Sequence, residues 1–345
     1  MTMPLPRFAP PLHRRWHLLL PIASFGLAVL SPARAEDMAA PPHDLAASPG
    51  AVLTANEIPS ARLVQDTSEI DENILLPAAR VDDDDGDSKW ARDYIAFAAG
   101  VISSPDYSGS DERRVLPAFY LRGRVSGFSF STRGTNFQVD LIRQRRGQKT
   151  DFKFGPTISL RGDRTGSVKD PQVAALGEKK MAVELGVFAG VTHTGVFTSN
   201  YDQIGFRLVG TKDISGRHGS WMASPSIDYG TPLSKRAFIG VSASVNIYGK
   251  GFGRYYYDID PIGSAASGLP VYNRAGRKAA AGKYTLGVAG AYGLSGDLRK
   301  GFVLLGGAQY GRLLSRFADS PIVKDAGSAD QWVFGAGLAY QFWGR

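Results

Sequence analysis

The chain has 345 residues, of which 40 are basic and 32 acidic, with a formal net charge of +8. Its 41 glycines, 14 tyrosines and 18 phenylalanines favour an all-β protein over a helix-rich one. Because the chain has no cysteine, disulfides, thiol catalysis and thiolate metal sites are excluded.

The first 35 residues have the features of a cleaved secretory signal peptide. Three arginines precede an apolar run over Leu18–Leu30, and residues 33–35 form a small-x-small cleavage site. An uncleaved transmembrane anchor is the alternative, but the run is well short of the roughly 20 residues that a spanning helix needs. We expect residues 1–35 to be removed. The mature chain then has 36 basic and 32 acidic residues and a net charge of +4, too small an excess to indicate a nucleic-acid partner.

Residues 36–89 differ in composition from the rest of the chain, with many Pro, Ala and Ser residues and an acidic run at Asp82–Asp87. We expect a disordered acidic segment on the periplasmic side. The acidic run lacks the spacing and the glutamate of an EF-hand, so a solvated linker is favoured over a divalent-cation site. No metal site and no cofactor is predicted.

From residue 90 onward, apolar residues alternate with polar or small ones, the period of two that is typical of β-strands. A soluble sandwich would bury the apolar face, whereas an outer-membrane barrel would turn it toward lipid and line its lumen with the other face. Aromatic residues occur at both ends of one apolar face, as with Trp221 and Tyr229 or Trp332 and Tyr340. This placement matches the two aromatic girdles of a transmembrane barrel.

We therefore predict an antiparallel transmembrane β-barrel over residues 90–345. The predicted strands are twelve, at 90–104, 115–123, 127–133, 135–143, 151–161, 181–195, 202–212, 220–230, 237–249, 283–294, 301–313 and 331–343. One strand over 127–143 would make eleven, but only twelve place the long connections outside the cell and the short turns in the periplasm. Both termini are then periplasmic, and a barrel of this size has a narrow or partly plugged lumen.

Charged residues lie on the polar faces of the predicted strands. We expect them to pair in a solvated lumen, although rings of them could tune ion selectivity in an open one. The predicted lumen charges are Asp140, Lys153, Arg161, Glu184, Arg207 and Asp228. The tyrosine run 255–257 lies in the longest external loop, where it could bind a surface partner or pack over the barrel mouth.

Catalytic machinery is not evident in the sequence. The histidines of the mature chain are His43, His193 and His218, and no Gly-x-Ser-x-Gly nucleophile elbow accompanies them. His193 lies near a strand end on the apolar side, where an interfacial ring is favoured over a general base. The sequence predicts a protein that is not an enzyme.

The last predicted strand is amphipathic and carries aromatic residues close to the C-terminus. Its residues Gly337, Tyr340 and Phe342 resemble the C-terminal signal that the barrel-insertion machinery recognises. In the usual signal the phenylalanine is the last residue, whereas three residues follow it here. We expect this strand to contact the insertion machinery during assembly.

The first external loop has a distinctive sequence, Pro-Asp-Tyr-Ser-Gly-Ser-Asp at residues 105–111, followed by a downstream proline. The motif residues are Pro105, Asp106, Tyr107, Gly109, Ser110, Asp111 and Pro117. They resemble the MipA/OmpV family of outer-membrane proteins, and the resemblance extends over residues 90–342. Turn chemistry explains most of the motif as a rigid loop, with a recognition patch or a lumen constriction as the alternative.

This resemblance implies a location in the outer membrane of a Gram-negative cell, in contact with its lipid and lipopolysaccharide. It also implies a scaffold that tethers a lytic transglycosylase and a murein synthase to that membrane. The residues themselves leave open a small-solute channel and an adhesin that acts through external loops. A scaffold needs contacts on the periplasmic side, whereas a channel needs an open polar lumen.

Overall fold

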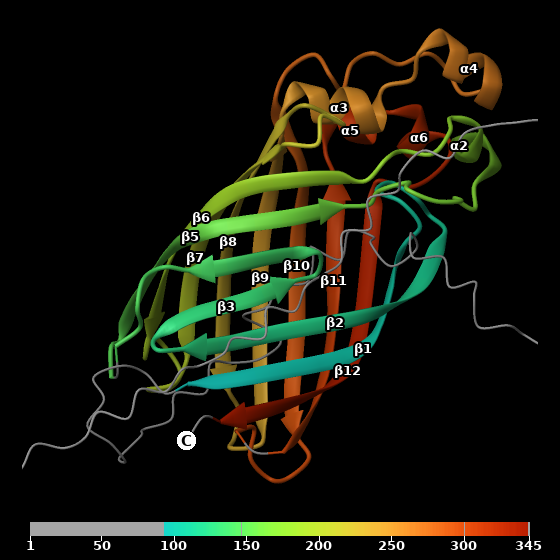
Figure 1. Cartoon of the computed structure of the whole chain (residues 1–345). Coiled ribbons are helices and arrows are strands. Elements are labelled where there is room, and N and C mark those ends of the chain that lie inside the picture. Colours follow the sequence, from blue (N-terminus) through green and yellow to red (C-terminus); the bar gives the residue numbers. More distant parts are fainter. Residues whose placement is uncertain (1–92, 146, 300, 344–345) are drawn as a thin grey trace, which may run out of the picture. The chain divides into compact units, whose positions relative to one another are not determined.

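The structure is a computed structural model that describes residues 93–145, 147–299 and 301–343. Within this part of the chain, twelve antiparallel strands close into a barrel in which β1 pairs with β12 (Figure 1). The strands are β1 (Tyr94–Pro105), β2 (Arg113–Val125), β3 (Phe128–Arg133), β4 (Asn136–Asp140), β5 (Thr150–Arg161), β6 (Ala182–Thr194), β7 (Gln203–Asp213), β8 (Trp221–Pro232), β9 (Ala237–Tyr248), β10 (Ala280–Gly293), β11 (Phe302–Leu313) and β12 (Asp330–Trp343). The predicted twelve-stranded antiparallel barrel is confirmed, whereas the predicted signal peptide and acidic segment lie outside the described residues.

Two tight turns delimit β3, and the second of them explains why residues 127–143 form two strands rather than one. Val125 pairs with Phe128, so the loop between β2 and β3 has only two residues, Ser126 and Gly127, with φ of 52° and 83°. Positive φ at both central residues is the geometry of a type I′ hairpin turn, whose twist matches that of the flanking strands. Gly134, with φ of 56°, then begins the equally short turn between β3 and β4.

The alternation of the sequence corresponds to the two faces of the barrel wall. In β6, Leu185 and Val187 are exposed on the outside, whereas Glu184 and Phe188 are buried on the lumen side. The same pattern in the other strands gives the barrel an apolar outer belt. An apolar exterior around a polar interior is the arrangement that a lipid bilayer requires of a barrel.

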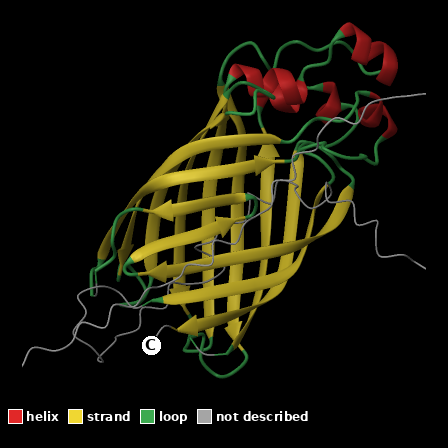
Figure 2. Cartoon of the chain, viewed as in Figure 1, coloured by secondary structure: helices red, strands yellow, loops and turns green. Residues whose placement is uncertain are grey.

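Short helices occur in the external loops, at the barrel end opposite to the C-terminus (Figure 2). They are α2 (Pro171–Ala175), α3 (Lys250–Tyr257), α4 (Pro261–Ser267), α5 (Ser315–Ala318) and α6 (Pro321–Lys324). Three of them have proline as the first residue after the N-cap, where the fixed φ of proline suits the start of a helix. Among the described residues, no helix is long and apolar enough to cross a membrane.

The strands β3 and β4 are much shorter than their neighbours, and β4 ends earlier than the predicted 135–143. As a result, β2 pairs with β3 only over Arg122–Val125, although it pairs with β1 along its full length. The Thr132 hydroxyl accepts a hydrogen bond from the Leu121 backbone N–H at 2.9 Å. A side chain thus replaces the next backbone contact at the point where pairing with β3 ends.

Candidate functional site

The external loops, residues 106–112, 162–181, 214–220, 249–279 and 314–329, pack together over the barrel mouth, and we call them the cap. Two apolar clusters form its interior. One contains Tyr248, Phe252, Tyr256, Tyr257, Ala275, Leu313, Phe317 and Val323. The other contains Tyr107, Val173, Ile259, Leu269, Ile322 and Ala326. The cap is therefore a packed structure with its own core.

The tyrosine run of the longest loop belongs to this core. Tyr256 and Tyr257 are only 2% and 1% exposed, and the Phe252 ring stacks on Tyr248 with 4.1 Å between centroids. The Arg164 guanidinium also donates a hydrogen bond to the Tyr256 carbonyl at 2.5 Å. The sequence left two roles open for this run, binding of a surface partner or packing over the barrel mouth. The structure shows the packing role for Tyr256 and Tyr257.

The first half of the family-like motif ties the first external loop to two other loops. Asp106 is buried, pairs with the Arg114 guanidinium and accepts a hydrogen bond from the Lys169 backbone N–H at 2.8 Å. Tyr107 is also buried, and its hydroxyl donates to the Ala326 carbonyl at 2.7 Å. Burial is the main reason why the pKa of this phenol is raised above its usual range.

The second half of the motif makes a close backbone approach. Gly109 has φ of +106°, and a methyl group added there would lie 2.5 Å from Val323 Cγ2, so only glycine fits. Its N–H donates to Gln331 Oε1 at 3.1 Å, and its carbonyl accepts from the Ser328 N–H at 2.8 Å. Ser110 is buried and accepts from the Glu112 N–H at 3.1 Å.

The remaining motif residues lie outside this loop junction. Pro105 is the last residue of β1, Asp111 is exposed and Pro117 lies in the middle of β2. The central motif residues Tyr107 and Gly109 therefore pack the first external loop against the last one, a position that fits the rigid-loop interpretation.

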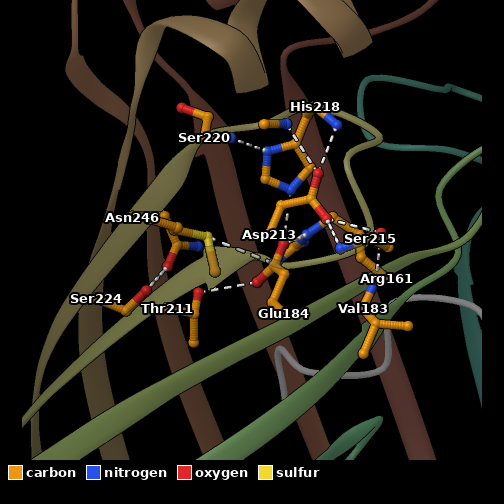
Figure 3. A network of polar contacts seen from close by, with 12 residues as sticks. Arg161, Val183, Glu184, Thr211, Asp213, Ser215, His218, Ser220, Ser224 and Asn246 are labelled. Atoms are coloured by element: carbon orange, nitrogen blue, oxygen red, sulfur yellow. Dashed lines mark hydrogen bonds and ion pairs between the residues drawn. The ribbon is translucent and has the colours of Figure 1, made fainter.

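A buried ionic network centred on Glu184 joins the polar barrel wall to the cap (Figure 3). Glu184 Oε1 accepts a hydrogen bond from Arg161 Nε at 2.7 Å, and both side chains are almost fully buried. Thr211 Oγ1 donates to Glu184 Oε2 at 2.9 Å. The Arg161 guanidinium also lies over the Phe252 ring, 5.2 Å from its centroid, and so contacts the cap helix α3.

His218 extends this network from the loop between β7 and β8. Its Nδ1 accepts a hydrogen bond from the Ser220 backbone N–H at 3.2 Å, so the ring proton is on Nε2, which faces Glu184 Oε1 at 3.2 Å. The edge of the ring also meets Phe252, with 5.4 Å between centroids. Both nitrogens are thus used in structural contacts.

Asp213 holds the same loop in place. Its carboxylate accepts hydrogen bonds from the backbone N–H groups of Ser215, His218 and Gly219, each at 2.8 Å. The Glu184 network and the Asp213 loop together fasten β5, β6 and β7 to the cap.

All six predicted lumen charges lie on the inner face of the wall, where they form two separate groups. Arg161 and Glu184 form an ion pair near the cap. The other four line a cavity of about 40 Å³ further from the cap, where Arg207 donates to Gln138 Oε1 at 3.0 Å. These four are Asp140, Lys153, Arg207 and Asp228.

The lumen has two chemically different walls. The side formed by β4 to β9 is mainly polar, and its buried residues include Gln138, Thr157, Ser159, Arg207, Thr211 and Ser226. The side formed by β10 to β12, β1 and β2 is mainly apolar, and its buried residues include Ala96, Ala98, Ile102, Ala291, Leu305 and Ala339. Each side lines its own cavity, of about 90 Å³ against the polar wall and about 180 Å³ against the apolar wall.

The C-terminal signal residues lie on β12 near the periplasmic end. Gly337 faces the lumen side, where an added methyl group would lie 2.7 Å from the Ala99 carbonyl oxygen. The Tyr340 ring lies between Phe302 and Phe342, with centroids at 5.1 and 4.6 Å. Phe342 is 59% exposed on the outer face. The role of these residues in insertion stays a prediction.

Sequence reasoning did not identify the Glu184 network as a unit, nor the partners of the first-loop motif. The sequence predicts Arg161 and Glu184 individually as lumen charges and assigns no role to His218. The strand register sets Ser159 opposite Glu184 and Glu184 opposite Asp213. Knowledge of this register would have predicted that Arg161 and His218 lie close to Glu184.

Within the described ranges, no group of three or more His, Cys, Asp or Glu residues is placed to hold a metal ion. The remaining described histidine, His193, has its Nδ1 at 2.7 Å from the Thr150 hydroxyl at the periplasmic end of the wall.

A closed antiparallel barrel with an apolar outer belt and a charged interior defines an outer-membrane β-barrel protein. The family described as MltA-interacting protein MipA matches residues 97–342, and the chain belongs to this family. Its location is the Gram-negative outer membrane.

The solved structures that match this chain are similar to it only at a low level. An outer-membrane channel from Pseudomonas putida F1 is 12% identical with a TM-score of 0.34, over 75% of this chain and 100% of that one. The toluene transporter TodX of Pseudomonas putida is 11% identical with a TM-score of 0.34, over 72% of this chain and 89% of that one. Such low scores carry no conclusion about solutes. No curated protein matches the sequence.

Proposed function

We propose that this protein is a non-enzymatic outer-membrane scaffold that holds a lytic transglycosylase, and through it a murein synthase, at the inner side of the outer membrane. The observation that carries this proposal is the packed cap, whose core residues such as Tyr257 and Phe317 are buried. A barrel closed in this way on the outside acts mainly at its periplasmic end. The family description, MltA-interacting protein, supports the same choice of partner.

The periplasmic turns offer a charged surface for such a partner. Among their described residues, the exposed charged side chains are all basic, because Asp202 is buried and Asp297 is partly buried against Arg299. The exposed basic residues are Arg143, Arg145, Lys149, Lys235 and Arg236. Complementary charge speeds encounter and fixes orientation, so we expect the partner to present an acidic surface to this rim.

The test is affinity capture of a lytic transglycosylase and a murein synthase from solubilised envelopes, with the tagged mature chain as bait. A variant that combines Arg145→Glu, Lys149→Glu, Lys235→Glu and Arg236→Glu is expected to capture about tenfold less, because each attractive pair becomes repulsive. Lys324→Glu, an exposed charge reversal in the cap, is the matched control and should leave capture unchanged. A chain without residues 36–88 shows whether the acidic segment contributes.

One outcome would remove the scaffold proposal, and two others would change the contact surface. Recovery of neither murein enzyme by the full mature chain removes the proposal altogether. Equal capture by the rim variant and by Lys324→Glu removes the basic rim as the contact surface. Loss of capture after deletion of residues 36–88 alone would transfer the contact to that segment.

A further inference from the structure

The barrel wall has a gap beside the part of β2 that is nearest the cap. The β3–β4 hairpin ends at Gly134 and Thr135, beside the end of β5, where the Leu160 N–H donates to the Thr135 carbonyl at 3.2 Å. β2 continues beyond its last contact with this hairpin, at Leu121, as far as Arg113 (Figure 1). Among the described residues, this part of β2 pairs with β1 only.

Both ends of the gap are closed by side chains. At the lower end, the Leu121 N–H is bound by the Thr132 hydroxyl at 2.9 Å. At the upper end, Lys169 of the cap donates from Nζ to the Arg113 carbonyl at 2.7 Å. Backbone groups along a strand alternate in direction, so the groups of Leu121 and Arg113 point to the same edge.

Between these two contacts, alternation directs the backbone of Val115, Pro117 and Phe119 into the gap. Pro117 has no N–H, which makes it suited to an unpaired strand edge. Val115 and Phe119 are 69% and 62% exposed, so the gap lies within the apolar belt of the barrel. Strand edges are not left bare in hydrocarbon, because each unpaired N–H and C=O group is costly there. The edge of β2 therefore needs a polar partner.

An apolar cavity lies directly behind the gap. Its volume is about 180 Å³, and small residues of four strands line it, among them Ala98, Ala118, Gly307 and Gly337. Small side chains leave space that larger ones would fill. An engineered protein cavity of about 150 Å³ lined by aliphatic residues and phenylalanine takes up benzene, so this one is large enough for one aromatic ring.

One polar atom faces this apolar space without a partner. The Thr135 hydroxyl, at the tip of the hairpin, is buried, and no described residue makes a hydrogen bond with it. Thr135 also lines the cavity. Because a buried hydroxyl without a hydrogen bond is costly, the site is completed by a ligand that carries a polar group.

We propose that this gap is a lateral opening through which a small amphiphile passes between the outer leaflet and the cavity. The amphiphile has an apolar part of about one aromatic ring and a hydrogen-bonding group that meets Thr135 and the β2 edge. The packed cap closes the route from the external medium, and the gap provides one from the membrane. This inference goes beyond the scaffold role and is independent of it.

Binding is tested with two fluorinated probes, 4-fluorophenol and 4-fluorotoluene, by fluorine NMR on the refolded mature chain in lipid nanodiscs. Both probes are expected to bind saturably. Thr135→Val should weaken 4-fluorophenol about threefold to tenfold, the worth of one hydrogen bond, and leave 4-fluorotoluene unchanged. Ala118→Phe, which fills the cavity, should weaken both probes about tenfold or more. Ala189→Phe, the same enlargement on the lipid face of β6, is the control.

The route is tested by closing the gap. Because the chain has no cysteine, Pro117→Cys and Thr135→Cys can be joined by a short bis-methanethiosulfonate bridge and released with a reductant. The bridge should slow 4-fluorotoluene exchange about tenfold or more, and reduction should restore it.

Absence of saturable binding, or equal binding by Ala118→Phe and Ala189→Phe, overturns the proposal. Unchanged exchange in the bridged form overturns the lateral route. Binding that is seen only after removal of residues 36–88 would assign the gap to that segment of the chain and overturn the proposal as well.

Discussion

The ion pair between Arg161 and Glu184 allows a quantitative test of how the cap is attached to the wall. Glu184→Ala removes the acceptor of hydrogen bonds from Arg161 at 2.7 Å and from Thr211 at 2.9 Å. It also removes the carboxylate that forms an ion pair with the buried Arg161 guanidinium. Loss of one partner of a buried pair costs about 3–5 kcal/mol, much of it from the charge that stays behind. We expect the free energy of unfolding to fall by about this amount.

The assay is denaturant unfolding of the refolded protein in lipid vesicles, followed by tryptophan fluorescence and extrapolated linearly to zero denaturant. The midpoint should fall while the slope stays unchanged, because the surface exposed on unfolding is the same. Glu178→Ala, which removes an exposed carboxylate from the same external loop region, is the control and should change stability by less than about 0.5 kcal/mol.

A double substitution separates the loss of this ion pair from the cost of keeping one of its buried charges. Replacement of a buried ion pair by apolar residues of similar volume is often neutral or stabilising by about 1–4 kcal/mol. Arg161→Met combined with Glu184→Leu should therefore recover most of the stability that Glu184→Ala loses. The reasoning is refuted if Glu184→Ala costs less than about 1 kcal/mol, or if the double variant is as unstable as the single one.

Further predictions concern the cap and one periplasmic turn. Gly109→Ala should destabilise the cap by about 1–3 kcal/mol, because φ of +106° and the contact with Val323 exclude a methyl group. Gly166→Ala, which adds a methyl group in open space, is the control and should leave the cap stable. The rate of protease cleavage in the external loops measures the difference. Burial by itself would raise the pKa of Asp202, but hydrogen bonds from three backbone N–H groups outweigh this effect and hold the pKa well below its usual range. The Asp202 carboxylate therefore stabilises the turn above about pH 3.9, and this contribution is lost as the pH falls further. Asp202→Asn should remove that acid dependence of unfolding. Burial, and then repulsion from a neighbouring arginine, lowers the pKa of Lys179 from 10.5 to about 8. The cap should therefore gain stability as the pH rises from about 8 to 10.5. Hydrogen exchange of the cap amides measures this gain, which should be absent in Lys179→Met.

The barrel could be predicted because its signals are local. Period-two alternation determines which side chains face lipid, as Leu185 and Glu184 show, and it needs no knowledge of strand partners. Turn chemistry at Gly127 likewise separates β2 from β3, and at Gly134 it separates β3 from β4. Both kinds of signal can be read from one sequence without knowledge of the strand partners.

The helices and contacts that build the cap could not be predicted, because the helices are short and the contacts are distant in sequence. A helix of four residues such as α5 shows no helical periodicity. Tyr107 binds the Ala326 carbonyl across 219 positions of sequence, and Arg161 meets Glu184 only because of the strand register. The sequence nevertheless contained a sign of the gap, since a proline within a strand indicates an edge, and Pro117 was noted only as part of a motif.

The cap is anchored on opposite sides of the barrel, and this limits how the lumen can be reached. The Glu184 network fastens it to β5, β6 and β7, while the hydrogen bond from Gly109 of the first external loop to Gln331 fastens it to β12. A hinged lid needs one free side, but release of either side here breaks buried hydrogen bonds, and on one side a buried ion pair as well. A solute that reaches the apolar cavity without such a rupture must pass through the wall or from the periplasmic end. With the lateral opening as the route, Glu184→Ala should therefore lower stability without changing the exchange rate of 4-fluorotoluene, and a faster exchange would mean that the cap itself opens.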